Sequence, residues 1–394
     1  MITVVGGVYR ERCVQPRWNA LYGSAGRAAA ALSYRHPVKL VTYVDDANNR
    51  ELHALAETLG FELRAERVRE TVSFDYVHPL SIPVIQPPPK VLSRAEPLTA
   101  QGDVVLRFGM MESTGVVEGD RVVYDPQSAY DPEPFAQNGS KAKSLAIVAN
   151  ALEVRLLTGT SDPEIGGSTL LANEGASVVV VKRGSRGALV LTAGARSAIP
   201  AFRTESVFSI GSGDMFAAAF TYFWGIELLD PTLAADLASR ATARYCESQA
   251  AELLSRSELE ALPYDRLTAS KGKVYLAGPF FTLAERWLVE EARTHLRGMH
   301  LDVFSPVHDV GFGPAEKIAK ADLKGVEECD RVLALVDSAD PGTLFEVGYA
   351  RKCGKPVVAL TETLSEEKKK MLIGSGCICT DDFATAIYLT SWVA

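Results

Sequence analysis

Two segments of this 394-residue chain place carboxylates where an enzyme could use them. In the first, Ile210-Gly211-Ser212-Gly213-Asp214 leads into an alanine-rich apolar stretch that predicts a helix. Glycines let backbone N–H groups turn inward, and a helix N-terminus adds partial positive charge, so the segment predicts an anion site. Asp214 in the first helical turn can accept a proton from an attacking hydroxyl group, which is the combination that phosphoryl transfer needs. A tight turn followed by a capping aspartate explains the same pattern.

The second segment lies towards the C-terminus, where Asp322, Asp340 and Glu346 follow or flank a predicted strand. A glutamate in a first helical turn is stabilised as the anion, and an ionised carboxylate can attack an oxocarbenium-like sugar carbon. A second carboxyl group that a like-charged neighbour keeps protonated can protonate a leaving base. Helix capping by Asp340 and Glu346 is the structural alternative.

The elements that must position these residues read as alternating strands and helices, which predicts an α/β fold with parallel sheets covered on both faces. The predicted strands are Thr3–Val5, Lys39–Tyr43, Asp103–Phe108, Arg121–Tyr124, Ser177–Lys182, Ala188–Leu191, Lys273–Leu276, Asp302–Phe304, Arg331–Val336 and Pro356–Leu360. The predicted helices are Ala28–Ser33, Lys141–Asn150, Asp214–Trp224 and Leu283–Leu296.

The stretch Pro263–Lys271 separates two such α/β systems, so the sequence predicts two domains. The proline-rich segment Pro83–Pro89 cannot be a central strand. It follows Thr71–Val77, which alternates like an exposed strand, and together the two segments predict a lid or a bulky loop.

Composition limits the classes of partner and the compartment. The net charge is −8 and no basic block stands out, which disfavours nucleic acid as a partner. The six cysteines form no CxxC pair and predict reduced thiols in a cytoplasmic protein. Met1–Gly7 reads as a first strand rather than a signal peptide, and no apolar run approaches the length of a membrane span.

On these motifs, residues 1–262 resemble the ribokinase-like, or PfkB, carbohydrate and nucleoside kinases. The resemblance implies that Asp214 is the catalytic base and that the loop Gly211, Ser212 and Gly213 is the anion hole. Asn150-Ala151-Leu152-Glu153 is similar to the family's Asn-x-x-Glu region, where the glutamate helps to place magnesium and phosphate. The segment Val179–Ala188, with Gly184 and Gly187, resembles the strand and glycine turn beside the nucleotide.

Tyr22–Ala29, which contains Gly23 and Arg27, stands where that family has its substrate-binding turn. The family carries an asparagine that touches the sugar, and here Arg27 takes its neighbourhood. Arg27 suggests an anionic substrate, or else it is a surface residue of a helix. Pro87-Pro88-Pro89 also departs from ordinary sheet residues in the lid, so a binding-only domain stays open as an alternative.

Residues 273–360 resemble the nucleoside 2-deoxyribosyltransferase family, which has a flavodoxin-like fold. The run Gly342–Ala350 is similar to the nucleophile motif, which implies that Glu346 forms a glycosyl-enzyme intermediate. The resemblance implies that Tyr275 holds Glu346 and that Asp322 and Asp340 bind and protonate the nucleobase. It places substrate-binding residues in two turns, namely Gly278, Pro279, Phe280 and Gly342.

That family includes transferases and deoxynucleoside monophosphate N-glycosidases, and the sequence fully matches neither subtype. The transferases complete each site with a C-terminal residue of a neighbouring subunit, often asparagine, and the tail Gly374–Cys379 offers none. The monophosphate N-glycosidases carry Ser and Arg in the turn after the first strand, and the turn Gly278–Phe281 has no arginine. Hydrolysis and transfer therefore both stay open.

Together these observations predict a kinase domain over residues 1–265 and a deoxyribosyltransferase-like domain over residues 272–394. ATP and Mg²⁺ are expected for the first domain and no cofactor for the second. The expected partners are a small nucleoside, nucleotide or sugar and further copies of the chain, with neither nucleic acid nor membrane. A bifunctional salvage enzyme, a single glycosidase or transferase with a non-catalytic kinase-like domain, and a nucleotide sensor are the three interpretations.

Overall fold

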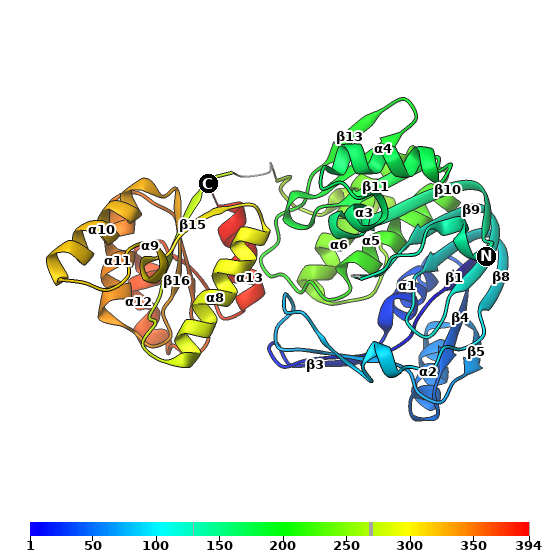
Figure 1. Ribbon diagram of the computed structural model, residues 1–394, viewed down its shortest axis with the longest axis horizontal. Helices are drawn as coiled ribbons and strands as arrows, with labels where there is room; N and C mark the ends of the chain where they lie inside the picture. Colours follow the sequence, from blue (N-terminus) through cyan, green and yellow to red (C-terminus); the bar gives the residue numbers. More distant parts are fainter. Residues whose placement is uncertain (129, 268–270, 394) are drawn as a thin grey trace. The chain divides into compact units, whose positions relative to one another are not determined.

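The computed structural model describes residues 1–128, 130–267 and 271–393. These residues form two compact units, shown in Figure 1. Unit 1 comprises residues 1–204 and 208–267, and unit 2 comprises residues 205–207 together with the chain from 271 onward. No helix among the described residues is both long enough and apolar enough to cross a membrane.

Unit 1 is built on a nine-stranded sheet in the order β13-β12-β11-β10-β9-β8-β1-β4-β5. Neighbouring strands are parallel except at β11–β12 and β12–β13, which are antiparallel. The strands are β1 Ile2–Val5, β4 Val38–Val44, β5 Glu62–Arg67, β8 Leu98–Phe108, β9 Gly115–Asp125, β10 Lys141–Asn150, β11 Val178–Lys182, β12 Ala188–Thr192 and β13 Arg196–Ile199.

Helices cover both faces of this sheet, because successive residues of each buried strand point to opposite sides. One face packs against α1 Gly23–Ser33, α2 Asp46–Leu59, α5 Ser212–Phe220, α6 Pro231–Ser248 and α7 Arg256–Ala261. The other packs against α3 Ala151–Thr158 and α4 Pro163–Asn173. Helix α5 runs on into the π-helical segment η4 Thr221–Ile226.

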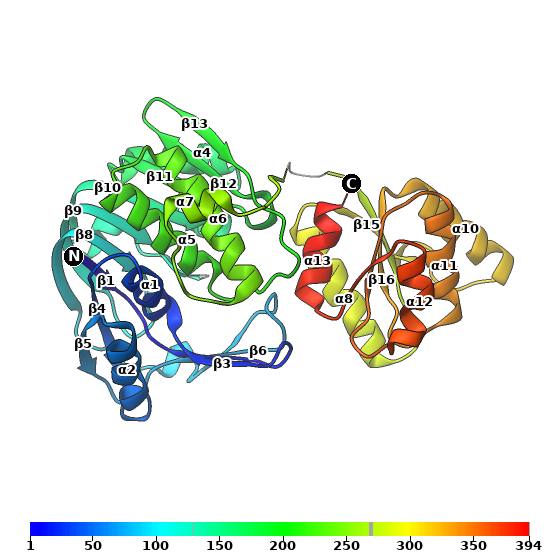
Figure 2. The same cartoon turned by 180° about the vertical axis from the view of Figure 1, so that it is seen from behind.

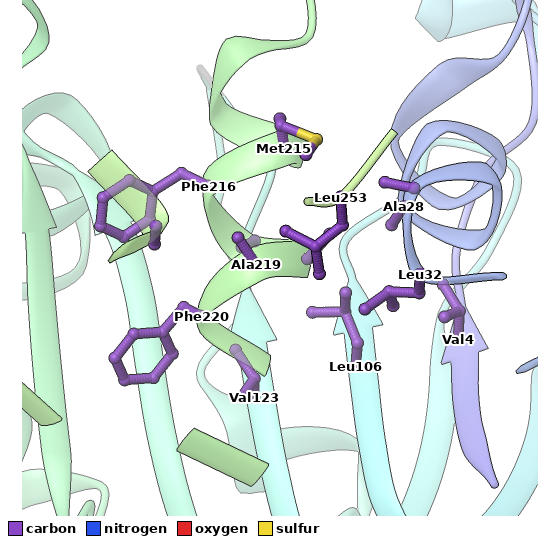
Figure 3. Close-up of a cluster of buried hydrophobic side chains, with 14 of the residues drawn as sticks. Val4, Ala28, Leu32, Leu106, Val123, Met215, Phe216, Ala219, Phe220 and Leu253 are labelled. Carbon is purple, nitrogen blue, oxygen red and sulfur yellow. The ribbon is translucent and has the colours of Figure 1, made fainter. Parts of the chain in front are cut away.

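The core beneath the first face fixes α1 next to α5. Figure 3 shows Met215, Phe216 and Phe220 of α5 in the same apolar cluster as Ala28 and Leu32 of α1. Alanine or glycine at most of the buried positions of α1 leaves little side chain between the two helices, so they approach closely. The polar residues at their N-terminal ends are thereby brought together.

A small second sheet, order β3-β2-β6-β7, stands apart from the large one. Its strands are β2 Arg10–Cys13, β3 Trp18–Leu21, β6 Ser73–Tyr76 and β7 Val84–Gln86. Strand β7 is the edge strand of this sheet. Prolines are tolerated beside an edge strand, because one side of it has no neighbouring strand to which a backbone N–H must donate. The segment Thr71–Val77 therefore contains a strand, as its alternation predicts, and the prolines are excluded from a central position.

The predicted helix over Lys141–Asn150 is wrong, because these residues form strand β10 between β9 and β11. Residues 145–149 are all buried, so they show neither the alternation of a half-exposed strand nor a polar face. A short apolar run of this kind has no periodicity that separates a central strand from a buried helix. The β-branched pair Ile147 and Val148 favours the strand.

Unit 2 contains a five-stranded, all-parallel sheet in the order β15-β14-β16-β17-β18, the order of flavodoxin-like folds. The strands are β14 Lys273–Ala277, β15 Asp302–Phe304, β16 Arg331–Leu335, β17 Val357–Leu360 and β18 Ile378–Thr380. The longer helices are α8 Leu283–Gly298, α10 Ala315–Glu328, α11 Pro341–Lys352, α12 Glu366–Gly374 and α13 Phe383–Trp392.

Helices α10, α11 and α12 share one apolar cluster with the sheet of unit 2. Helices α8 and α13 contact each other and the strands, and Figure 2 shows them together on the other face. The predicted α/β class, with sheets covered on both faces, is confirmed in both units; the sheet of unit 2 is all parallel, and that of unit 1 is parallel except at β11–β12 and β12–β13.

Candidate active sites

In unit 1, Asp214 lies in the first turn of α5 and is only 5% exposed. The helix begins after Gly211, whose φ of +78° is a left-handed conformation that favours glycine. A Cβ at Gly211 would stand 2.1–2.4 Å from three guanidinium atoms of Arg27. Glycine is therefore required at this position both for the turn and for the close approach of an arginine.

Arg27 is fully buried, which contradicts its interpretation as a surface residue of a helix. Its Nη1 donates to Asp214 Oδ2 at 2.7 Å and to Glu11 Oε1 at 3.2 Å, while Nη2 donates to Glu11 Oε2. The guanidinium also lies over the rings of Tyr22 and Tyr245, at 5.4 and 5.7 Å from their centroids. One buried cation thus joins α1, α5 and strand β2 of the small sheet.

The second carboxylate oxygen of Asp214 is also occupied by the chain. Gln127 donates from Nε2 to Asp214 Oδ1 at 3.0 Å, and its Oε1 accepts from Ser24 Oγ at 3.1 Å. Ser24 Oγ in turn lies 3.0 Å from Tyr9 Oη. Gln127 has a φ of +50°, which is uncommon for a residue with a side chain. A continuous set of side-chain hydrogen bonds therefore surrounds Asp214.

Burial raises the pKa of Asp214, and the cations Arg27 and Lys182 oppose this effect. Lys182, the last residue of β11, pairs with the buried Asp125. The Lys182 amine lies 3.3 Å from where a Cβ of Gly213 would stand, so it faces the glycine turn. The turn therefore combines a helix N-terminus with an amine, which suits a phosphate group.

Glu153 is the third residue of α3 and forms a capping box with the N-cap residue Asn150. Its burial and the nearby Asp125 raise the pKa of Glu153 to about 7, although Lys182 lowers it. A carboxyl group in this state, beside a second carboxylate, can become fully ionised next to a divalent cation. Asp125 and Glu153 thus fit the oxygen ligands that Mg²⁺ prefers, directly or through water.

The remaining residues predicted for unit 1 lie in turns. Gly23 opens α1 with a φ of +58°. Gly184 and Gly187, with φ values of +57° and +73°, make the tight turn between β11 and β12. Ser212 is the first residue of α5.

In unit 2, strands β15 and β16 flank β14, so the chain changes direction across the sheet at β14. Ligands of open parallel sheets bind outside the carboxyl ends of the strands at such a point. Tyr275 of β14 is fully buried and stacks on Phe304 at 5.4 Å. Its hydroxyl donates to Glu346 Oε1 at 2.8 Å, so the predicted pair is formed.

Burial, together with the negative charges of Asp322 and Asp340, raises the pKa of Glu346 to about 7, although the hydrogen bond from Tyr275 lowers it. The structure therefore brings all three carboxyl groups within electrostatic reach. Asp340 is also the N-cap of α11, accepting from Thr343 N at 2.7 Å and from Thr343 Oγ1 at 3.0 Å. Both the chemical and the capping interpretation of Asp340 are thus compatible with its position.

Asp322 on α10 has a buried Oδ1 without a hydrogen-bond partner among the described residues. Burial also raises the pKa of this carboxyl group. A buried polar atom left unpaired is costly, so a position of this kind suits a group that pairs with a ligand. Gly342 lies in the first turn of α11, next to Asp340.

The turn Gly278–Phe281 follows β14 and carries an aromatic cluster. The ring of Phe280 lies 5.3 Å from that of Phe281 and 5.9 Å from that of Phe312. Phe281 and Phe312 are 65% and 80% exposed. Such exposed rings offer faces on which a nucleobase can stack.

His308 and Asp309, which follow β15, both form hydrogen bonds with nearby residues of the chain. His308 Nε2 lies 2.6 Å from Glu290 Oε1, and Asp309 accepts from Ser305 N at 2.7 Å.

Sequence reasoning gave no role to several residues that the structure brings to these sites, namely Glu11, Asp125, Gln127, Lys182 and Phe312. Asp125 and Lys182 end their strands and Gln127 follows β9, so the rule that ligands sit at carboxyl ends of parallel strands could have found them. Glu11 lies on β2, a strand that the sequence did not predict.

Two family models match the chain. Residues 113–243 match the pfkB family carbohydrate kinase model, and residues 274–385 match the nucleoside 2-deoxyribosyltransferase model. Both resemblances are confirmed. The first match includes Asp125, Lys182 and Asp214, and the second includes Tyr275 and Glu346.

One curated relative, an uncharacterized protein of Ureaplasma parvum serovar 3, is 33% identical over 95 residues. The match covers 21% of this chain and 60% of the relative's length.

Solved structures give the fold of unit 1. A pyrophosphate-dependent kinase in the ribokinase family, complexed with a pyrophosphate analog and myo-inositol, superimposes with a TM-score of 0.51 at 18% identity. The match covers 66% of this chain and 100% of that one, so the N-terminal fold is ribokinase-like. A nucleoside kinase of Burkholderia thailandensis in complex with inosine gives a TM-score of 0.48 at 16% identity, covering 66% of this chain and 95% of that one.

Proposed function

We propose that residues 272–394 form a domain that cleaves or transfers the N-glycosidic bond of a nucleoside or nucleotide, with Glu346 as the nucleophile. The observation that carries the proposal is the hydrogen bond from Tyr275 to Glu346, with Asp322 and Asp340 beside it. The match of residues 274–385 to the deoxyribosyltransferase model supports the same chemistry.

In the proposed reaction, a Glu346 oxygen attacks the anomeric carbon and the carbon–nitrogen bond breaks. The base leaves with the bonding electrons and takes a proton from Asp322 or Asp340. A nitrogen of another base, or water, then attacks the anomeric carbon, gives its proton back to that aspartate and returns Glu346 as the carboxylate. Tyr275 donates its hydroxyl hydrogen bond throughout, because burial and the nearby Glu346 raise its pKa and keep it protonated.

Replacing Glu346 with alanine tests this role, because the attack needs its carboxylate. Base release from a panel of nucleosides, deoxynucleosides and monophosphates, followed by chromatography, is expected to fall at least ~10³-fold. Glu367→Ala, on the exposed surface of α12, is the matched control and should release base like the wild type. Undiminished release by Glu346→Ala would exclude Glu346 as the nucleophile.

For residues 1–265 we propose ATP-dependent phosphorylation of a sugar or nucleoside, because Asp214 stands at the N-terminus of α5 beside the Gly211–Gly213 turn and Lys182. ATP with Mg²⁺ supplies the phosphoryl group when bound, and Asp125 and Glu153 are the residues that would hold the metal. Asp214 takes the proton of the acceptor hydroxyl, while the turn and Lys182 hold negative charge.

The Asp214→Asn variant tests the kinase proposal, because it keeps a side chain of the same shape without the basic carboxylate. We expect ADP formation with a suitable acceptor to fall at least ~10²-fold, measured by a coupled assay. Unchanged ADP formation would contradict the kinase proposal and favour a non-catalytic domain that binds a ligand or senses a nucleotide.

A further inference from the structure

Side chains of the protein already donate hydrogen bonds to both carboxylate oxygens of Asp214, the group that is to take the proton of the substrate hydroxyl. Arg27 holds one carboxylate oxygen at 2.7 Å and Gln127 holds the other at 3.0 Å. Two further terminal contacts of Arg27 go to Glu11, and a longer one, at 3.4 Å, goes to the carbonyl oxygen of Gly23. A hydroxyl group that is to give its proton to Asp214 must therefore enter a place that donors of the chain already occupy.

Charge decides which ligands can enter. The Arg27 side chain is fully buried, and those of Glu11 and Asp214 are 3% and 7% exposed. Removing one partner from a buried ion pair is costly, because the remaining charge is neither solvated nor compensated. A neutral polyol that displaced Glu11 would impose this cost, whereas an anionic group would exchange one negative partner for another.

Arg27 also keeps an unused donor. Its Nε is buried and has no hydrogen-bond partner among the residues that the structure describes. The glycine turn packs against the same guanidinium group, since a Cβ at Gly211 would stand 2.1 Å from Cζ and 2.2 Å from Nε. The Nε–Nη2 edge of a guanidinium binds carboxylate or phosphate through two parallel hydrogen bonds. Exchange of Glu11 for a ligand anion would therefore satisfy one more donor than the present pairing does.

Glu11 belongs to the small sheet, and this makes the exchange feasible. Strand β2 pairs with β3 and β6, and neither it nor these neighbours belong to the nine-stranded sheet. Burial raises the pKa of Glu11, although Arg27 lowers it. The ionised carboxylate of Glu11 therefore carries a free-energy cost, because burial has removed it from water. Releasing Glu11 to water recovers that cost while the apolar core around α1 and α5 stays packed.

We propose that Arg27 is a specificity-determining residue, which selects a hydroxylated acceptor carrying a phosphate or carboxylate group over a neutral sugar or nucleoside. The anion replaces Glu11 on Arg27, β2 moves away, and the acceptor hydroxyl reaches Asp214. The catalytic consequence rests on the proposed kinase function, and the binding step does not.

Calorimetric titration of the full-length protein without ATP tests the binding step. The probes are ribose, ribose 5-phosphate and ribonate, which share a carbon skeleton and differ in their charged group. We expect at least one anionic probe to bind ~10-fold or more tightly than ribose, and the two anions distinguish phosphate from carboxylate. Arg27→Gln should bring that probe to the affinity of ribose, which also assigns the binding to unit 1.

Glu11→Gln provides a test in the opposite direction, because it removes the carboxylate that competes for Arg27. Anion affinity should rise several-fold, and this variant decides the question if a thermal melt shows that Arg27→Gln does not fold. Equal binding of ribose and both anions, or an anion preference that neither substitution changes, would overturn the proposal. If no acceptor yields ADP with ATP and Mg²⁺, the kinase function fails, while the titrations still decide the role of Arg27.

Discussion

Glu346 has a pKa of about 7, and the hydrogen bond from Tyr275 lowers the value that burial and two neighbouring carboxyl groups would otherwise set. The attacking form is the carboxylate. Base release should therefore decline as the pH falls through about 7.

Tyr275→Phe tests this interpretation with a measurement that loss of packing would not imitate. Removing the hydrogen bond takes away a contribution that lowers the pKa of Glu346, so the pKa rises and the pH–rate profile moves to higher pH. The ring keeps its stacking on Phe304. An unshifted profile of kcat/KM would mean that Tyr275 only packs against the site.

Asp340 can be tested for its two roles separately, because asparagine is as good an N-cap as aspartate but cannot act as an acid. Asp340→Asn should keep the free energy of unfolding within about 0.5 kcal/mol of the wild type, while base release falls at least ~10-fold. Urea denaturation and chromatography measure the two effects. Normal base release by this variant would leave Asp340 as a cap alone.

The run of residues 340–346 in unit 2 could be read from the sequence because it is contiguous: Asp340 is the N-cap of α11. The prediction that Glu346 lies in the first helical turn is wrong, because α11 begins at Pro341 and Glu346 is its sixth residue, in the second turn. Arg27 was not predictable in the same way. It stands in an alanine-rich helix whose sequence does not reveal that the polar residue points inward, and its partner Glu11 is on a strand that the sequence did not predict. Long-range ion pairs leave no local pattern.

At the scale of elements, the packing of α1 against α5 positions the proposed kinase site. Strands with clear apolar, β-branched runs, such as β1 and β4, were predicted. The half-exposed strand β5 was missed, and β10 was taken for a helix because all of residues 145–149 are buried. The four-residue strands β2 and β3 carry polar and aromatic residues without clear alternation, so the sequence did not indicate them.

Gly211→Ala tests how tightly these helices hold the arginine. An added Cβ would meet a left-handed backbone and the buried guanidinium, so we expect a loss of about 3 kcal/mol or more in the free energy of unfolding. Gly60→Ala is the matched control, because Gly60 has a φ of +72° with no atom within 4 Å of the added Cβ. It should cost about 1–2 kcal/mol from backbone strain alone. Equal losses in urea denaturation would argue against the close approach of Arg27.

At the scale of the whole molecule, each unit contains its own sheet, its own apolar core and its own candidate site. In the sequence, two alternating systems of strands and helices on either side of a polar stretch predict two domains, over residues 1–265 and 272–394. The sequence could not predict which substrates the units share, since fold alone does not determine function. Two self-contained candidate sites are what the proposal of two separable activities requires.

The most direct test of this account measures base release and ADP formation side by side in the wild type, Asp214→Asn and Glu346→Ala, each with and without ATP and Mg²⁺. We predict that the wild type releases base without ATP, that Glu346→Ala loses only base release, and that Asp214→Asn loses only ADP formation. Loss of both activities in either variant, or base release by Glu346→Ala, would contradict the account.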